Sequence, residues 1–146
     1  MRAFGRGMGY LWASPNTLLG LLFSGAALAT GGRARRVDGV LESHGGIVAV
    51  ILRRMVPLRG GASAMTLGHV VLGRDAGALE RTRAHERAHV RQYEQWGPFF
   101  LLGYAGASLV AALRGRHYYL DNAFELAART AATSAGGRLT VAEKQP

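Results

Sequence analysis

The sequence His85-Glu86-Arg87-Ala88-His89 places two histidines four residues apart, with a glutamate directly after the first. On an α-helix, residues at positions i and i+4 lie one turn apart on the same face, so both imidazoles can reach one metal ion. Zinc binds histidine nitrogens at about 2.0–2.1 Å, and the neighbouring glutamate can take a proton from a zinc-bound water. Because so short a motif also occurs by chance, the surrounding sequence must support it.

The residues around the motif predict a helix that carries both histidines. Asp75 is a residue type that caps helix starts, and no glycine or proline occurs from 78 to 96. Gly97-Pro98 then forms a typical helix end. Gln92 and Trp96 fall on the same helical face as the histidines, so we expect them to pack beside the ligands or contact them.

The composition limits how a metal could be held. At 146 residues, the chain is long enough for one domain with a hydrophobic core. It contains no cysteine, which excludes disulfides and thiolate zinc sites, so any zinc must be held by histidine or carboxylate side chains. The same absence leaves the compartment open: cytoplasmic, membrane-associated and secreted locations all suit a chain without thiols.

The charge distribution argues against specific nucleic-acid binding. The net charge is +9, and 17 of the 18 basic residues are arginine. These arginines are scattered along the chain and do not form one basic stripe with interleaved aromatic residues. Charge alone still predicts a loose affinity for anionic partners, including a membrane surface.

Residues 1–32 form an apolar N-terminal segment, in which positions 7–32 carry no formal charge. Three interpretations remain open. The segment could be a packed or membrane-surface helix that starts near Ser14-Pro15-Asn16. It could be a membrane anchor, since about 20 apolar residues span a bilayer. It could also be a signal peptide with a cleavage site at Ala27-Leu28-Ala29.

Short β-branched runs predict a small antiparallel sheet ahead of the motif. Val37–Glu42 and Ile47–Leu52 are separated by His44-Gly45-Gly46, which favours a β-hairpin that turns at these glycines. Met65–Gly73 is a further strand candidate with turn residues on both sides.

Two further helices are expected after the motif. Pro98–Leu113 is apolar and charge-free, and a third helix is expected from Asn122 to Ala132, capped by Asp121. If the apolar segment crossed a bilayer, about 30 Å of hydrocarbon would separate the motif from the third helix. A zinc site shared between them therefore requires the apolar segment to be a core helix or a shallow re-entrant one. We expect a domain at 33–133 and a flexible tail at 134–146.

A catalytic zinc usually has three protein ligands, so a third ligand is needed besides His85 and His89. Glu125 is the preferred candidate because it lies one turn into the third helix among small and apolar residues, where a carboxylate must be exposed, paired or metal-bound. An exposed glutamate or an arginine partner is the alternative. His69 is a second candidate ligand, or else a half-buried strand histidine.

The sequence from His85 to Pro98, followed by Asp121-Asn122-x-x-Glu125, resembles the gluzincin group of zinc metallopeptidases and, more narrowly, small bacterial proteins of minimal zincin type. The resemblance covers about residues 65–130. It implies a zincin-like fold. Together with the elements expected above, the fold class is α+β: a small antiparallel sheet, an active-site helix with HExxH, two further core helices and, ahead of them, an N-terminal apolar helix. It also implies that His85, His89 and Glu125 bind zinc. Ala128 and Arg129 stand where the family often has an acidic residue that orients a zinc histidine, so the orienting group must come from elsewhere, with Asp121 or a backbone carbonyl as candidates.

The function that the resemblance implies is peptide hydrolysis by a zinc-bound water, with Glu86 as the general base and a peptide or protein as the substrate. His117, Tyr118 and Tyr119 are candidate donors to the oxyanion, with ordinary interfacial aromatic residues as the alternative. Thr66, Gly68 and His69 lie on a strand that could hold an extended peptide by edge pairing.

Two other functions remain open. The first is a zinc-binding domain of the same fold without turnover, since the small size leaves little room for a substrate cleft. The second is a membrane-associated structural protein in which the motif is accidental.

Overall fold

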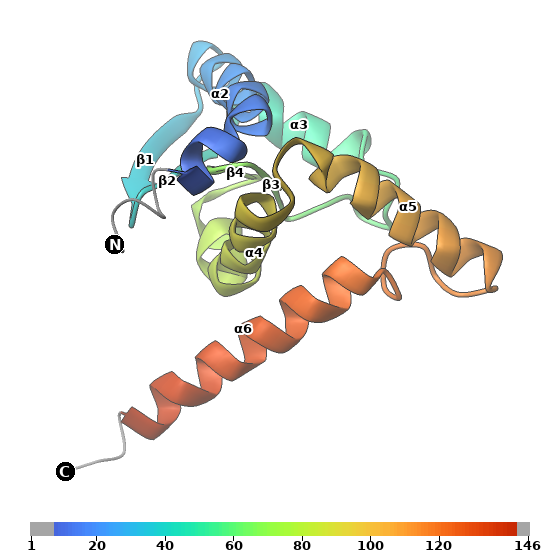
Figure 1. Cartoon of the computed structure of the whole chain (residues 1–146). Coiled ribbons are helices and arrows are strands. Elements are labelled where there is room, and N and C mark those ends of the chain that lie inside the picture. Colours follow the sequence, from blue (N-terminus) through green and yellow to red (C-terminus); the bar gives the residue numbers. More distant parts are fainter. Residues whose placement is uncertain (1–7, 143–146) are drawn as a thin grey trace.

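The computed structural model describes the backbone of residues 8–142 and the side chains of residues 8–135 (Figure 1). It has an α+β architecture with a small mixed sheet of four strands. Residues 8–12 are helical and precede α2. The elements that follow are α2 (Ser14–Ala29), β1 (Arg33–Val37), β2 (Val40–His44), α3 (Gly46–Arg54), β3 (Ala64–Leu67), β4 (Val70–Gly73), α4 (Ala76–Trp96), the 3₁₀ turn η1 (Gly97–Phe99), α5 (Phe100–Leu113) and α6 (Ala123–Ala142).

Two hairpins build the sheet, in the strand order β1-β2-β4-β3. β1 pairs antiparallel with β2, and β3 pairs antiparallel with β4, but β2 and β4 run parallel. Parallel neighbours need a crossover connection, and the chain between β2 and β4 supplies it with α3. The expectation of a wholly antiparallel sheet is therefore wrong.

The predicted hairpin at His44-Gly45-Gly46 is also wrong. The chain turns earlier, at Asp38-Gly39, where both residues have positive φ. The apolar run Ile47–Leu52 lies within helix α3 and buries Val48 and Leu52, which are four residues apart. A short apolar run fits a buried strand or a buried helix equally well, and the packing surface decides between them.

The predicted strand Met65–Gly73 is broken in two. Gly68, with φ of 62°, and His69 form the turn between β3 and β4. At Gly68 an added Cβ would lie 2.2 Å from Thr17 Oγ1, so the turn is also closely packed against the start of α2. β3 is consequently a short edge strand, and it passes directly beside α4.

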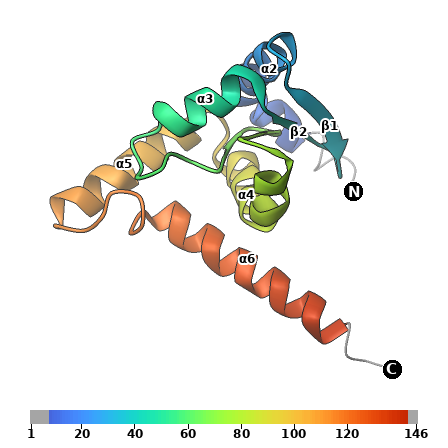
Figure 2. The same cartoon turned by 180° about the vertical axis from the view of Figure 1, so that it is seen from behind.

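Two helical layers cover the sheet. α2 and α3 pack on one face, and their hydrophobic cluster with the sheet is Ala27, Val48, Leu52, Leu67, Val70 and Leu72. α4 packs on the other face, where the cluster is Val40, Val71, Leu79 and Val90. β4 is buried along its whole length because it lies between these two layers. Figures 1 and 2 show α6 beyond α4, on the side of the molecule away from α2 and α3.

The helix with the motif follows the prediction closely. Asp75 Oδ1 accepts a hydrogen bond from the Ala78 N–H at 2.8 Å, which caps α4. The helix ends at Gly97, where φ is 55°. Within the described residues, the one stretch long and apolar enough to span a membrane by length and composition is Ala76–Leu113, which Gly97 interrupts.

The two helices after the motif differ from expectation. α5 buries only Phe100 and Ala111, so it is a surface helix with one packed face rather than a core helix. α6 begins at Ala123, and Asn122 Oδ1, rather than Asp121, accepts a hydrogen bond from the Phe124 N–H at 2.8 Å. α6 also continues to Ala142, beyond the expected end at Ala132.

Candidate metal centre

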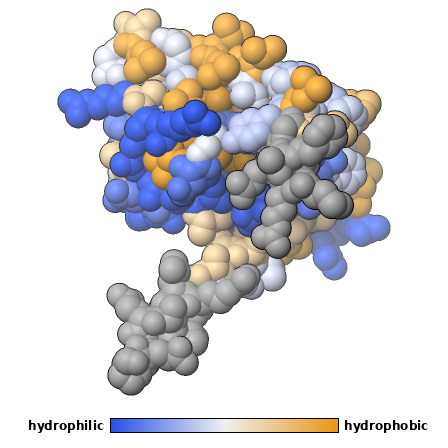
Figure 3. Space-filling view, turned by 60° about the vertical axis from the view of Figure 1, so that its left-hand side comes forward, coloured by the Kyte–Doolittle hydropathy of each residue, from blue (hydrophilic) through white to orange (hydrophobic). Residues whose placement is uncertain are grey.

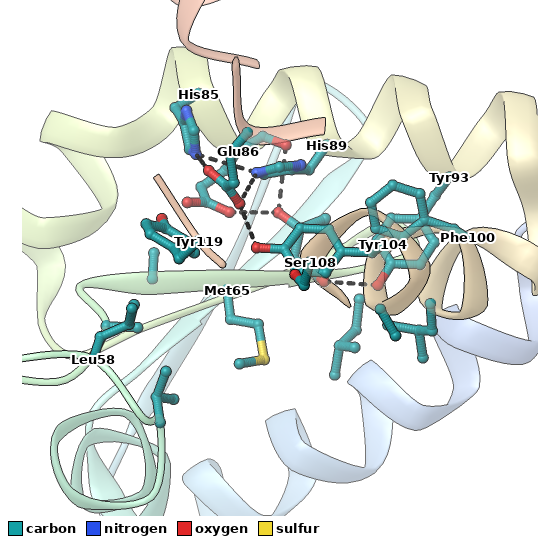
Figure 4. A pocket seen from close by; sticks show the side chains of 18 of the residues that line it. Leu58, Met65, His85, Glu86, His89, Tyr93, Phe100, Tyr104, Ser108 and Tyr119 are labelled. Atoms are coloured by element: carbon teal, nitrogen blue, oxygen red, sulfur yellow. Dashed lines mark hydrogen bonds and ion pairs between the residues drawn. The ribbon is translucent and has the colours of Figure 1, made fainter. Parts of the chain in front are cut away.

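Three side-chain ligand atoms converge between α4 and α6 (Figure 4). His85 Nε2 lies 3.2 Å from Glu125 Oε2, and His89 Nε2 lies 3.3 Å from Glu125 Oε1. The two imidazole Nε2 atoms are 3.1 Å apart. Ligand atoms at 2.0–2.1 Å in a tetrahedron are separated by about 3.3–3.4 Å, so these spacings suit a zinc-sized ion. The group of His85, His89 and Glu125 could therefore hold a metal ion.

Asn122 holds the start of α6 where Glu125 can reach α4. Its buried amide donates to Tyr104 O at 3.0 Å and to Ser108 Oγ at 2.8 Å, both on α5. Glu125 follows three residues later, one turn into the helix. The apolar α5 thus returns the chain to the site, and the expected convergence of Glu125 with the paired histidines is observed.

Most of the site is buried, and its surroundings favour the ionised form of Glu125. The side chain of Glu125 is 4% exposed. Burial opposes its ionisation, but the contacts with His85 and His89 and a hydrogen bond from Tyr104 outweigh burial and hold the pKa of Glu125 well below its usual range. Its Oε2 atom, although buried, has no hydrogen-bond partner among the described residues. An unsatisfied buried carboxylate oxygen beside two imidazoles fits the donor set of a divalent cation.

Gln92 selects the tautomer of His89. Its Nε2 donates to Phe124 O at 3.0 Å, which leaves Oε1 to accept from His89 Nδ1 at 2.8 Å. With Nδ1 as the donor to Gln92, Nε2 is the ring nitrogen that faces His85 and Glu125, and it would offer its lone pair to a metal ion bound there. Asp121 does not take this orienting role, because its carboxylate accepts from the His117 N–H.

Glu86 lies next to the ligands without belonging to the three-ligand group. It is 5% exposed, and its Oε2 accepts a hydrogen bond from Thr66 Oγ1 on β3 at 2.7 Å. Burial raises the pKa of Glu86, against the opposing effects of the Thr66 hydrogen bond and the two histidines. A carboxylate with a raised pKa is suited to accept and return a proton.

A cavity of about 380 Å³ opens beside these groups. It is lined by β3, α4 and α5, by Glu125 of α6, and by the loops after α3 and before α6. Apolar and aromatic side chains form most of its wall, and the polar atoms are gathered at the ligands (Figure 4). The lining residues include Leu58, Met65, Thr66, His85, Glu86, His89, Tyr93, Phe100, Tyr104, Ser108, Tyr118, Tyr119 and Glu125.

The three expected oxyanion donors are placed differently. Tyr119 lines the cavity, and burial together with the nearby Glu125 raises its pKa to about 12. Tyr118 also lines the cavity, but its hydroxyl donates to Pro57 O. His117 is exposed and does not line the cavity, and its Nδ1 accepts from the backbone N–H groups of Tyr119 and Leu120.

The three expected substrate-binding residues are also separated. Thr66 lines the cavity and contacts Glu86. Gly68 and His69 lie in the turn after β3, outside the cavity lining. His69 is 4% exposed, with Nε2 at 2.9 Å from Glu94 Oε1 and its ring stacked on Tyr10, so it is not brought to the metal ligands.

Two functional candidates were not identified from the sequence. Tyr104 donates to Glu125 Oε1 at 2.7 Å, and Tyr93 donates to Thr66 O at 3.1 Å. Burial raises the pKa of both hydroxyls, with Glu125 adding to the effect at Tyr104 and Glu86 at Tyr93. Both tyrosines occur within helices, and only the packing of α4 against β3 and of α5 against α6 shows their partners.

Comparison of the chain with models of protein families, with curated proteins and with solved structures finds no match.

Proposed function

We propose that this protein is a zinc-dependent metallopeptidase. The observation that carries the proposal is the convergence of His85 Nε2, His89 Nε2 and a Glu125 carboxylate at tetrahedral spacing, with the buried carboxylate of Glu86 adjoining them. The resemblance of His85–Pro98 and Asn122-x-x-Glu125 to gluzincins supports the same ligand assignment.

The cavity favours catalysis over a purely structural site. Structural zinc sites are closed by four protein ligands, whereas catalytic sites keep one position for water or substrate. The described residues supply a group of three ligands, which borders the 380 Å³ cavity. That volume accommodates side chains of a bound peptide, and its apolar wall favours hydrophobic ones.

Zinc, when bound, would lower the pKa of a water molecule and polarise the peptide carbonyl. Glu86 would accept the proton of the attacking water and pass it to the leaving amine. Thr66 holds the Glu86 carboxylate in place for both transfers. Tyr119 stays protonated at neutral pH, because its pKa is raised to about 12, and its hydroxyl can donate to the developing oxyanion.

The edge strand β3 is the proposed support for an extended substrate. It borders the cavity, and the sheet has no strand beyond it on that side among the described residues. Main-chain pairing along such an edge holds peptides in extended conformation. The bond from Tyr93 to Thr66 O already uses one backbone acceptor of β3, so pairing would use the remaining groups.

The test combines metal analysis with a peptidase assay on the purified full chain. Wild type should contain about one zinc per chain, and His89→Ala should lose it because one of three ligands is removed. Glu86→Gln should keep zinc and lose about 10²–10⁴-fold in turnover of a quenched fluorescent peptide library. Glu80→Gln, on the exposed face of the same helix, is the matched control and should keep both.

The outcomes separate three functions. Zinc that is lost in His89→Ala, with no peptidase activity in wild type, would indicate a zinc-binding domain without turnover. No zinc in wild type would mean that the motif is accidental, which leaves a membrane-associated structural protein.

A further inference from the structure

Helix α2 is apolar on the face that points away from the protein, whereas small and polar residues form most of the face that packs. Its buried residues Asn16, Gly20, Ser24 and Ala27 lie against the rest of the fold. On the opposite side, Leu18 is 62% and Leu22 is 71% exposed. A surface helix of a protein that meets only water normally has polar residues on its outer face. This outer face is therefore suited to an apolar environment.

Helix α5 shows the same arrangement. Tyr104 and Ser108 face the cavity and form hydrogen bonds with Glu125 and Asn122, respectively. On the outer side, Leu102 and Leu113 are 71% and 78% exposed. Neither α2 nor α5 contains a charged residue. Spacings of seven and four residues place Leu102, Leu109 and Leu113 on one stripe of α5.

The two helices meet at η1: α2 contacts this turn near its own N-terminal end, and η1 leads directly into the N-terminal end of α5. Asn16 Nδ2 donates to Gly97 O at 3.0 Å, and the rings of Trp12 and Phe99 lie 6.3 Å apart. Figures 1 and 2 both show α2 and α3 on the side of the molecule away from α6, whereas α5 extends to the start of α6 and packs against it. We call the outer residues of α5, α2 and the helical residues 8–12 the leucine face: Leu11, Leu18, Leu22, Leu102, Leu109 and Leu113, each at least 59% exposed.

We propose that the leucine face binds the surface of an anionic lipid bilayer, with α2 and α5 lying in the interfacial layer. Both helices keep their inner faces packed on the protein, so only the outer leucines enter the acyl region. Figure 3 shows hydrophobic residues gathered along the top of the molecule, where α2 lies, and hydrophilic residues below them. Exposed apolar surface of this extent marks a membrane or protein interaction site.

The charge distribution selects anionic lipid over a second copy of the chain. The net charge is +9, and the helices that form this side are followed or closed by arginines: Arg33 after α2, Arg53 and Arg54 at the end of α3, and Arg114 and Arg116 after α5. All five are exposed. Pairing two copies through this face would bring these like charges together, whereas anionic headgroups would neutralise them.

The proposal does not depend on the metal site, because no ligand or cavity group belongs to the leucine face. The test is cosedimentation of the full chain with vesicles of phosphatidylcholine alone and of phosphatidylcholine with phosphatidylglycerol. Wild type should bind the anionic vesicles more tightly. The double variant Leu22→Glu, Leu102→Glu should reduce the partition coefficient by at least about 100-fold, because two leucines no longer enter the acyl region.

The matched control carries the same change of charge on α6. Ala127→Glu with Thr133→Glu alters two exposed positions away from the leucine face and should bind within about fivefold of wild type. Equal losses in both double variants would mean that net charge alone drives binding, and would overturn the proposal. The proposal would also be overturned if wild type formed a dimer that does not bind vesicles and if the double variant Leu22→Glu, Leu102→Glu were monomeric.

A second measurement does not require the leucine variants to fold. Trp12 and Trp96 are the two tryptophans of the chain, and Trp12 lies beside Phe99 at the junction of the two helices. In a Trp96→Phe variant, lipids brominated on their acyl chains should quench Trp12 fluorescence when anionic vesicles are added. Unchanged fluorescence with bound vesicles would place another surface at the bilayer and overturn the proposal.

Discussion

Nδ1 of His89 lies 2.8 Å from Oε1 of Gln92, and the amide nitrogen of Gln92 donates to the backbone of Phe124. One side chain thus orients the candidate ligand His89 on α4 and ties it to the helix that carries Glu125. An acidic residue one turn after Glu125 is not needed to orient His89, because the side-chain amide of Gln92, on the same helix as His89, already does so.

Replacing Gln92 by leucine should weaken zinc binding about 10–100-fold, because the orienting hydrogen bond is lost and the ring of His89 is free to turn. Competition titration against a fluorescent chelator measures this affinity. Gln95→Leu, at an exposed position of the same helix, is the control and should bind zinc as wild type does. If Gln92→Leu bound zinc as tightly as the control does, Gln92 would not be needed to orient His89 for zinc binding.

Replacing Tyr119 by phenylalanine should lower turnover about 10²–10³-fold with zinc retained, because a donor to the oxyanion is lost. The comparison variant is Tyr118→Phe, which removes the hydroxyl that contacts Pro57 O. Its turnover should exceed that of Tyr119→Phe by at least about tenfold. The reverse order in steady-state kinetics would assign the donor to Tyr118.

The convergence of the three candidate ligands could be predicted from the sequence because their positions are local or strongly marked. His85 and His89 are one helical turn apart, and a single carboxylate follows among small and apolar residues in the third helix. Tyr104 and Ser108 could not be assigned, since their roles arise only when α5 folds back against α6. The four-residue spacing of Tyr104 and Ser108 places both hydroxyls on one face of α5, but it does not show what they contact.

The sheet was harder to predict than the site for a related reason. The run Ile47–Leu52 contains no polar residue, so it shows neither the alternation of a strand nor the three-to-four-residue period of a helix. Its state follows from packing: Val48 and Leu52 enter the cluster that also holds Ala27 of α2 and Val70 of β4. The parallel pairing of β2 with β4 depends on this crossover, and a local pattern does not contain it.

Replacing Gly20 or Gly25 of α2 by alanine should change the stability of the protein in opposite directions. A Cβ on Gly20 would lie 2.6 Å from Val70 Cβ and 2.9 Å from Leu67 O, whereas one on Gly25 would meet nothing within 4 Å. Gly20→Ala should therefore lower the free energy of unfolding by about 1–3 kcal/mol. Gly25→Ala should raise it by up to about 1 kcal/mol, because alanine favours helix. Urea denaturation measures both, and equal effects would contradict the close packing of α2 on the sheet.

The buried carboxylate of Glu42 should make the stability of the protein depend on pH. Its carboxylate is 2% exposed and accepts from Arg83 at 2.8 and 3.0 Å and from Arg35 at 3.3 Å. Burial opposes its ionisation, but the hydrogen bonds and charges of Arg83 and Arg35 outweigh burial and lower the pKa of Glu42 below the usual 4.5. A lowered pKa in the folded state stabilises the protein above the unfolded-state pKa, and this contribution is lost as the pH falls through the folded-state value.

Glu42→Gln should therefore reduce the free energy of unfolding by about 1.5–3 kcal/mol at neutral pH, because hydrogen bonds to charged groups are lost. The difference from wild type should shrink as the pH falls below about 4.5, where protonation of Glu42 removes the same charge from wild type. Urea denaturation with a chelator present measures this without a contribution from metal release. Glu80→Gln, whose carboxylate is 65% exposed and 4.0 Å from Arg35, should differ from wild type by less than about 1 kcal/mol. A loss in Glu42→Gln that stays constant down to acidic pH would mean that the side chain stabilises the sheet by its shape and not by its charge.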